Sequence, residues 1–390
     1  MERSEQNRWF GVGSSRDNES FAAGEDAARA AVRGGDPKLA IVFASEAHDL
    51  HELLAGVRRS TGDAPLVGCS TAGEIATTGP GESGVVVAAL GGSGFACATA
   101  ASTNASERLR DAGAEAGACV AEVDGKPNRV LLLLSDGLAG DQQEIVRGAY
   151  SVAGAAIPLV GGCAGDDLKM RRTYQFHNGD VLQDSVVAAA IASDAPFGIG
   201  VQHGWRKVGE PMLVTGSTGN RVHTLDDQPA LDVYLERLGA PEGVRGDAAA
   251  FTRYAMTHPL GLSRRSGEEV RFIAEADFSD RSLGCIAAVP HGGLVWIMEG
   301  DADSVLNATD AACDDALQSL EGQKPLGLLA FDCIARRGVL GDEGIAREVQ
   351  RISDYAVGAP VAGFYTYGEI ARTHGISGFH NQTLVVLALT

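Results

Sequence analysis

Three apolar runs follow one another in the carboxyl-terminal part of the chain: GLLAFDC (327–333), PVAGFYTYGEI (360–370) and LVVLAL (384–389). Two earlier segments have the same order of runs. They are LAIVFAS (39–45), PLVGCSTAGEI (65–75) and VVVAAL (85–90), and then VLLLLS (130–135), PLVGGCAGDD (158–167) and SVVAAAI (185–191). In each copy an amphipathic stretch separates the first two runs. Each copy therefore predicts a strand, a helix, a second strand, a loop and a third strand.

The short apolar runs are bounded by Gly, Pro and Asp, as buried strands are, and the stretches between them have the spacing of crossover helices. These helix-like stretches are residues 48–60, 141–153 and 342–355. We therefore predict an α/β fold in which repeated β-α-β-β units form mixed sheets flanked by helices. The expected arrangement is a layered αββα one, with two sheets face to face and internal pseudo-symmetry. The first runs of the three copies should be equivalent strands.

Further helix-like stretches, residues 106–120 and 304–320, precede the second and third copies, which indicates that a larger module is duplicated. The segment between the two halves does not match the repeat. Within it, GAPEGVRG (239–246) has the composition of a linker. We therefore predict two domains, residues 1–238 and residues 239–390.

Length, charge and cysteine usage exclude several classes of protein. The chain of 390 residues has room for two to three domains of roughly 150 residues. A balance of 32 basic and 51 acidic residues argues against a nucleic-acid partner. No secretory signal is visible, and no apolar run approaches the roughly 20 residues that cross a bilayer. The seven cysteines include no close CxxC pair, which argues against disulfides or structural zinc. We expect a cytoplasmic protein without a membrane partner.

Six strings along the chain carry a resemblance to a known family. They are GCSTAGEI (68–75), FGIGVQHGW (197–205), PALDVYLERLG (229–239), HPLGL (258–262), GFYTYGEI (363–370) and FHNQTL (379–384). Together, in this order, they resemble the FIST family, the F-box and intracellular signal transduction domains. The resemblance implies an amino-terminal and a carboxyl-terminal FIST domain, a sensory role in bacterial signalling and a small-molecule ligand, for which amino acids have been proposed. A subset of the family resembles haem proteins that sense nitric oxide and regulate histidine kinases.

The loop after the second run of the third copy is the first candidate for a ligand site. Ligands of open α/β sheets collect outside the carboxyl ends of strands. This loop combines aromatic hydroxyls and a carboxylate with glycines, and a polar segment opens the next strand. The predicted lining is Gly363, Tyr365, Thr366, Tyr367, Glu369, His380, Asn381 and Gln382. The alternative is that the tyrosines pack in the core and that Asn381 holds a turn.

A carboxylate follows a glycine at the matching place of each copy: Glu74, Asp166 and Glu369. Such a group either binds a ligand ammonium or accepts backbone N–H bonds in a turn. We expect the turn role for Glu74 and Asp166, because a duplicated motif keeps its geometry first. For Glu369 we expect ligand contact.

Two other interpretations stay open. A haem sensor needs one axial nitrogen, for which the candidates are His203, His177 and His380. A hydrolase would use Ser70, although its GCSTA context lacks the last glycine of a nucleophile elbow. The sequence shows no His and acidic residue in the order that a catalytic triad with Ser70 would need, and aromatic residues make up only 6% of the chain. We therefore expect no enzyme activity, no metal site and no bound cofactor. The predicted function is a small-molecule sensor module that signals to a protein such as a histidine kinase or a cyclic-dinucleotide enzyme.

Overall fold

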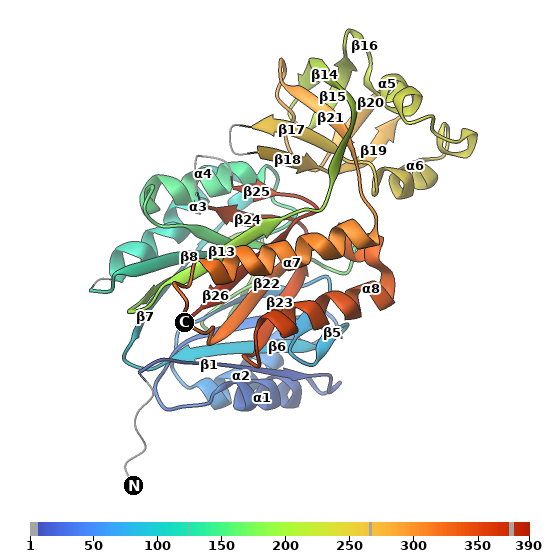
Figure 1. Ribbon diagram of the computed structural model, residues 1–390. Helices are drawn as coiled ribbons and strands as arrows, with labels where there is room; N and C mark the ends of the chain where they lie inside the picture. Colours follow the sequence, from blue (N-terminus) through green and yellow to red (C-terminus); the bar gives the residue numbers. More distant parts are fainter. Residues whose placement is uncertain (1–6, 124, 265–266, 374–377) are drawn as a thin grey trace.

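The computed structural model describes residues 7–123, 125–264, 267–373 and 378–390. Three six-stranded mixed sheets form a body, and an eight-stranded antiparallel sheet forms a unit inserted into the third copy. Figure 1 shows the inserted unit at one end of the body, which carries helix pairs on its outer sides. The predicted α/β class, with mixed sheets and flanking helices, is confirmed.

Each sheet of the body takes four strands from one copy of the repeat and two from another. The first contains, in order, β1 (Trp9–Ser15), β6 (Val85–Gly91), β2 (Pro37–Ala44), β3 (Leu66–Ser70), β10 (Gln175–His177) and β11 (Asp180–Leu182). The second contains β7 (Phe95–Thr103), β12 (Ser185–Ser193), β8 (Asn128–Ser135), β9 (Leu159–Cys163), β24 (Glu369–Arg372) and β25 (Phe379–His380). The third contains β13 (Phe197–Gln202), β26 (Leu384–Leu389), β22 (Gly327–Cys333), β23 (Val361–Thr366), β4 (Glu74–Ala76) and β5 (Gly79–Gly81).

A pair of helices covers each sheet on its outer face. The pairs are α1 (Ser20–Ala31) with α2 (Leu50–Thr61), α3 (Leu109–Gly117) with α4 (Gln142–Ala153), and α7 (Ala302–Gln318) with α8 (Ile334–Tyr355). The carboxylates of Asp49 and Asp141 accept backbone N–H bonds from the first turns of α2 and α4, which sets where these helices begin. The third copy differs, because α8 starts earlier and is interrupted at Gly341, where φ is 63°.

The first runs of the three copies are equivalent strands, as predicted. Each of β2, β8 and β22 pairs in parallel with the second strand of its copy and antiparallel with the last. The parallel register places Ala44 beside Ser70, Ser135 beside Cys163, and Asp332 beside Tyr365. The internal pseudo-symmetry therefore holds residue by residue.

The hairpin that follows each second strand joins the sheet of another copy. Strand β10 pairs with β3, β24 pairs with β9, and β4 pairs with β23. Backbone hydrogen bonds also connect the copies where they meet: Ala72 N to Tyr365 O at 3.0 Å, Gly165 N to Ser70 O at 3.0 Å, and Tyr367 N to Cys163 O at 3.1 Å. The exchange is cyclic, so each sheet of the body needs two copies.

The inner faces of all three sheets share one hydrophobic core. At its centre Phe43 stacks on Phe364 with ring centroids 4.8 Å apart, and Phe331 meets both rings edge to face. We expected two sheets face to face, and the structure brings three together. The cyclic exchange explains the third sheet. Each hairpin pairs with the sheet of another copy, so all three sheets are joined to one another around the core. The helices lie outside, as the layered arrangement predicts.

Glycines let the helices of the first two copies cross closely. A Cβ on Gly56 of α2 would lie 2.0 Å from the carbonyl oxygen of Phe21, and one on Gly148 of α4 would lie 1.9 Å from that of Arg110. Each glycine stands seven residues after the capping aspartate of its helix. Helix–helix contact at these positions therefore leaves no room for a side chain.

We expect Gly148→Ala to destabilise the protein by about 2 kcal/mol, because the cost of separating α3 from α4 exceeds the gain in helix propensity. Gly246→Ala is the matched control, since a Cβ there meets open space. Urea unfolding of the two variants checks this expectation. Equal midpoints would show that the helices can shift without cost.

The inserted unit lies between β13 and α7 in the chain and has its own hydrophobic core. Its strands are β14 (Arg206–Thr218), β15 (Arg221–Leu225), β16 (Gln228–Pro229), β17 (Leu260–Arg264), β18 (Gly267–Arg271), β19 (Ile273–Asp277), β20 (Ser282–Cys285) and β21 (Leu294–Glu299), with helices α5 (Ala230–Arg237) and α6 (Ala248–Ala255). Residues on both sides of the division predicted between 238 and 239 pack in this core. Among the described residues, no helix has both the length and the apolar character needed to span a membrane.

Candidate functional site

The predicted ligand loop lies at the carboxyl end of β23, and its side chains are largely buried. Tyr365, Thr366 and Glu369 have no exposed surface. Gly363 is required by the sheet itself, because a Cβ there would lie 1.9 Å from the carbonyl oxygen of Ala330. The structure therefore brings the predicted loop residues together in a closed arrangement.

Glu369 makes the same contacts in the third copy as Glu74 makes in the first. Thr366 Oγ1 donates to Glu369 Oε1 at 2.5 Å, and Thr383 N donates to Oε2 at 3.1 Å. Glu74 accepts from Thr71 Oγ1 at 2.6 Å and from a backbone N–H at 3.1 Å. Burial raises the pKa of Glu74 to about 7 and that of Glu369 to about 8. Both carboxyl groups hold a turn, and ligand contact by Glu369 stays a prediction.

Asp166 is not the counterpart of these two glutamates. In the neighbouring sheets Glu74 lies opposite Phe364, Glu369 opposite Gly162, and Gln175 opposite the equivalent Cys69. Gln175 therefore occupies the third equivalent position. The comparison of the three sequences placed Asp166 at this position because the second copy carries an insertion before β10.

The insertion is the loop of residues 166–174, which stands where the first copy has a single glycine. Asp166 accepts three backbone N–H bonds, from residues 170–172, at 2.7 to 3.0 Å. The Tyr367 hydroxyl donates to Asp166 and accepts from Leu168 N at 2.7 Å. Leu168 and Met170 have positive φ and are 61% and 54% exposed. The turn role expected for Asp166 is thus present, within a loop tied to the predicted site by Tyr367.

The polar segment at the start of β26 links the third copy to the inserted unit. Gln382 Nε2 donates to Met256 O at 2.7 Å, and the backbone carbonyl oxygen of Gln382 accepts from Trp205 Nε1 at 3.1 Å. His380 lies further back, with Nε2 2.9 Å from the carbonyl oxygen of Ala371. Both predicted residues lie near the inserted unit, Gln382 beside Met256 and His380 beside Glu269 and Arg271 of β18.

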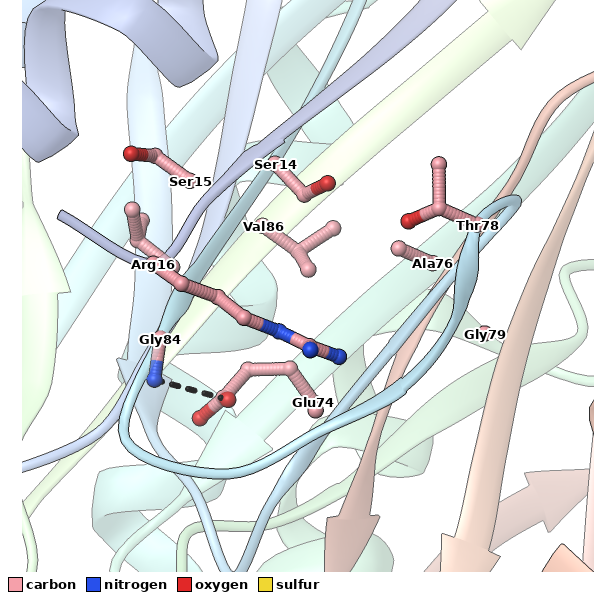
Figure 2. Close-up of a pocket in the computed structure, with 11 residues that line it drawn as sticks. Ser14, Ser15, Arg16, Glu74, Ala76, Thr78, Gly79, Gly84 and Val86 are labelled. Atoms are coloured by element: carbon pink, nitrogen blue, oxygen red, sulfur yellow. Dashed lines mark hydrogen bonds between the residues drawn. The ribbon is translucent and has the colours of Figure 1, made fainter. Parts of the chain in front are cut away.

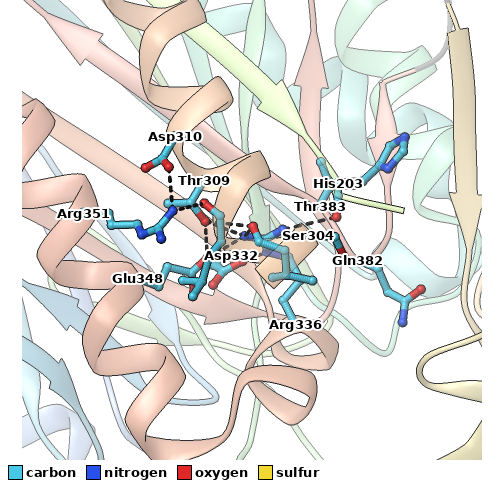
Figure 3. A network of polar contacts seen from close by, with 12 residues as sticks. His203, Ser304, Thr309, Asp310, Asp332, Arg336, Glu348, Arg351, Gln382 and Thr383 are labelled. Atoms are coloured by element: carbon cyan, nitrogen blue, oxygen red, sulfur yellow. Dashed lines mark hydrogen bonds and ion pairs between the residues drawn. The ribbon is translucent and has the colours of Figure 1, made fainter. Parts of the chain in front are cut away.

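A buried charged network fills the space between α7, α8 and the end of β22 (Figure 3). Arg336 Nε lies 2.6 Å from Asp332 Oδ1, and its Nη2 lies 2.5 Å from Glu348 Oε1. Thr309 Oγ1 donates to the same Glu348 oxygen at 2.7 Å. All three charged side chains are at most 1% exposed.

The third copy also concentrates buried polar atoms that have no hydrogen-bond partner in the described structure. Six of the nine such atoms lie here, and all six are oxygens: Asp332 Oδ2, Glu348 Oε2, Ser353 Oγ, Tyr365 OH, Asn381 Oδ1 and Gln382 Oε1. Native proteins seldom leave buried polar atoms unpaired, and each case calls for an explanation such as a ligand or a proton. Three predicted residues, Tyr365, Asn381 and Gln382, thus have unpartnered oxygens in the same copy as two carboxylates that the sequence analysis did not select.

Comparison of the copies shows what the sequence analysis missed. Asp332 stands where the first two copies have Ala44 and Ser135. Glu348 stands seven residues after the break in α8, the place of the close-packed glycines in α2 and α4. A carboxylate inside an apolar run, in one copy only, was the signal by which the sequence analysis could have selected Asp332.

The histidines considered as haem ligands make hydrogen bonds within the protein. His177 Nε2 lies 3.1 Å from Thr99 Oγ1, and His203 Nδ1 accepts from Trp205 N at 2.9 Å. The ring of His380 contacts a carbonyl oxygen, as described above. A haem needs an available axial nitrogen beside a large apolar slot. One ring nitrogen of each histidine already has a partner within the protein, and the absorbance spectrum of the purified protein tests the haem interpretation.

The possible nucleophiles are buried and lack an activating partner in the described structure. Ser70 Oγ donates to Gly165 O at 2.8 Å and accepts from Tyr174 N at 2.9 Å. Burial raises the pKa of the Cys163 thiol to about 12. The contacts at Ser70 are those of a residue that connects two copies.

The described surface includes hollows of different sizes. The one beside Glu74, with Arg16 reaching over it in Figure 2, encloses about 20 Å³, room for little more than a water molecule. A cleft of about 630 Å³ lies beside Arg58 and Asn178. Another, of about 390 Å³, lies between α4 and the inserted unit and includes Gln143 and Arg271. Ligand sites commonly have volumes of roughly 300–1,000 Å³, so the two clefts have room for a metabolite.

Comparison with known proteins agrees with the resemblance. The model of the FIST N domain matches residues 38–228, and that of the FIST C domain matches residues 230–372. An uncharacterized protein of Mycobacterium tuberculosis is 26% identical over 373 residues, which cover 93% of this chain and 94% of the relative. An uncharacterized Mycobacterium bovis protein is 26% identical over 380 residues, covering 93% and 92%. One from Methanocaldococcus jannaschii is 23% identical over 247 residues, covering 58% and 47%. The chain therefore belongs to the FIST family, whose domains are associated with sensing in signal transduction.

Proposed function

We propose that this protein is a sensor module that binds a small metabolite with a protonated amine, such as an amino acid, in its third copy. The observation that supports this proposal is the group of unpartnered buried oxygens around Asp332, Glu348 and Tyr365. Nothing equivalent is found in the described parts of the first two copies at the matching positions, which are occupied by Ala, Ser and Gly.

The chemistry of these atoms favours a cationic donor. Carboxylate and amide oxygens accept hydrogen bonds, and an ammonium group offers three donors and a positive charge. The network contains one guanidinium, that of Arg336, against two carboxyl groups. An ammonium group would supply both the missing charge and the missing donors.

Access to these oxygens requires movement of the first part of α8. Residues 334–340 cover the site and end at the break at Gly341. Arg337 holds this segment down, since its Nη1 donates to Ala72 O at 2.9 Å and its guanidinium lies 5.3 Å from the centre of the Tyr365 ring. We propose that ligand binding displaces the segment as a unit, as lids do in many binding proteins.

We also propose that the protein binds its ligand without transforming it and without a cofactor. The hydrogen bonds that Ser70 and the candidate axial histidines make within the protein support this. The signal would then leave through contact with a protein, for which a histidine kinase or a cyclic-dinucleotide enzyme is the candidate suggested by the family.

Tyr365→Phe tests the proposed site. The hydroxyl of Tyr365 has no partner in the described structure, so we expect the ligand-free variant to be as stable as the wild type. If the hydroxyl contacts the ligand, the thermal shift produced by the binding compound should shrink. The measurement is a thermal-shift screen of the twenty amino acids and simple primary amines, followed by calorimetric titration.

Matched variants separate a ligand contact from a structural role. Tyr234→Phe removes a buried hydroxyl that donates to His258 O at 2.7 Å, and it should lower stability by about 1 kcal/mol without changing affinity. If Glu369 contacts the ligand, Glu369→Gln should weaken binding by about 1.5–3 kcal/mol, whereas Glu74→Gln should not. Unchanged affinity in Tyr365→Phe, or a strong Soret absorbance band in the purified protein, would contradict the proposal.

A further inference from the structure

The network of Asp332, Arg336 and Glu348 carries an uneven charge if every group is ionised. One guanidinium faces two carboxylates, all at most 1% exposed. An uncompensated charge in the protein interior costs several kcal/mol, and a buried group avoids that cost by becoming neutral. The charge count alone therefore favours one bound proton.

The hydrogen-bond pattern points to where the proton lies. Arg336 takes one oxygen of each carboxyl group, and the other oxygens, Asp332 Oδ2 and Glu348 Oε2, have no donor in the described structure. The two carboxyl groups lie within hydrogen-bond reach of each other. Two carboxylate oxygens cannot bond to each other unless a proton lies between them. Burial, and then the Glu348 carboxylate, raise the pKa of Asp332 well above its ordinary value.

The groups around the pair do not remove the surplus charge. The titratable groups around it include Arg336 itself, Cys313 on α7, Cys333 at the end of β22, Arg337 on α8, Tyr365 on β23 and Glu369 on β24. Arg337 is the other cation among them, and it is directed towards Ala72 O and the exposed carboxylate of Glu82. Glu369 can only add negative charge.

The fold does not need this arrangement, because the first two copies build the same helix pair without it. There the helices cross at glycines, and the strand position of Asp332 is taken by Ala44 or Ser135. The polar pair is a feature of the third copy, and Arg336 connects it to the covering segment 334–340.

We propose that in the ligand-free protein Asp332 and Glu348 hold one proton between their carboxyl groups, so that the third copy has a shared-proton site that the matching positions of the other two copies lack. The proton keeps the network neutral and joins β22 to the part of α8 that follows Gly341, on which Glu348 lies. Its loss at higher pH leaves two neighbouring buried carboxylates, and their repulsion weakens this contact. The inference concerns the ligand-free protein, so its test can succeed or fail independently of the ligand proposal.

The sign of the pH dependence follows from linkage. A folded state that keeps a proton which the unfolded carboxyl groups have released loses stability as pH rises. Between pH 6 and 8 we expect the unfolding equilibrium constant of the wild type to rise, relative to that of Glu348→Gln, by up to about tenfold per pH unit. The variant carries the donor permanently on its amide nitrogen and should lack this contribution. Urea unfolding across this pH range measures both constants.

Two further variants complete the test. Asp332→Asn replaces the other carboxyl group of the pair with an amide and should give the same flattened pH profile. It provides the test if Glu348→Gln fails to fold. Glu144→Gln, on the equivalent helix α4, removes a partly exposed carboxylate paired with Arg147 and should leave the profile unchanged. Parallel profiles for wild type and Glu348→Gln would overturn the proposal. So would failure of both neutral variants to fold, since each retains the shape of the native side chain.

Discussion

A chain that ends at residue 228, after the FIST N match, should not fold on its own. Although it contains two complete copies of the repeat, β9 loses the exchanged strand β24, and β4 loses its partner β23. The core also loses Phe364, which stacks on Phe43, and Phe331, which meets Phe43 edge to face. Burial of such a side chain contributes about 1.5–3 kcal/mol, and whole domains are stable by only about 5–15 kcal/mol. The loss of an entire sheet therefore exceeds the available stability.

The matched control removes the inserted unit instead. Arg206 and Glu299 are cross-strand partners, so a short glycine-containing turn can join residue 205 to residue 300. The shortened chain keeps all three sheets and the central core, and we expect it to unfold cooperatively. Near-ultraviolet circular dichroism and urea titration distinguish the two chains. A cooperative transition in the chain that ends at residue 228 would show that the strand exchange is not essential.

Arg336→Ala should be the most damaging single substitution in the polar network. It leaves Asp332 and Glu348 buried without a cation, and breaking a buried ion pair from one side costs about 3–5 kcal/mol. The lost guanidinium also donates to Thr309 Oγ1 at 3.0 Å. We therefore expect a large drop in the midpoint of urea unfolding at pH 7.

Arg351→Ala on the same helix provides the comparison. Its ion pair with Asp310 is partly exposed, with side-chain exposures of 31% and 35%, so its loss should cost at most about 1 kcal/mol. Similar midpoints for Arg336→Ala and Arg351→Ala would contradict the view that the buried network matters for stability. A smaller effect of Arg336→Ala at pH 5 than at pH 8 would agree with protonation of the remaining carboxyl groups.

Much of the fold could be predicted from apolar periodicity. The run at 39–45 became β2, that at 130–135 became β8, and that at 327–333 became β22, all in equivalent positions. The number of sheets around the core could not be predicted in this way. It depends on which edge the strands β4, β10 and β24 join, and these are short strands whose composition is compatible with several edges.

The sequence analysis placed the candidate site in the third copy, which also holds most of the unpartnered buried oxygens of the described structure, but it did not select two of the carboxylates there. Tyr365 and Gln382 were chosen for their polar side chains after a strand, and both lie in the region of unpartnered oxygens. Asp332 and Glu348 were missed because one lies inside a buried strand and the other in the middle of a helix, where no turn or loop draws attention to them.

The sequence by itself determined the threefold repeat, the α/β class and membership of the FIST family, because strand and helix periodicity and ordered motifs are local properties of the chain. Only the tertiary structure decided that each copy lends a hairpin to another, that Gln175 rather than Asp166 matches Glu74, and that Asp332 and Glu348 meet around Arg336. These are contacts between residues distant in sequence. Side-chain type restricts such contacts to buried or exposed places, but the choice of partner follows from how the whole chain closes around its core.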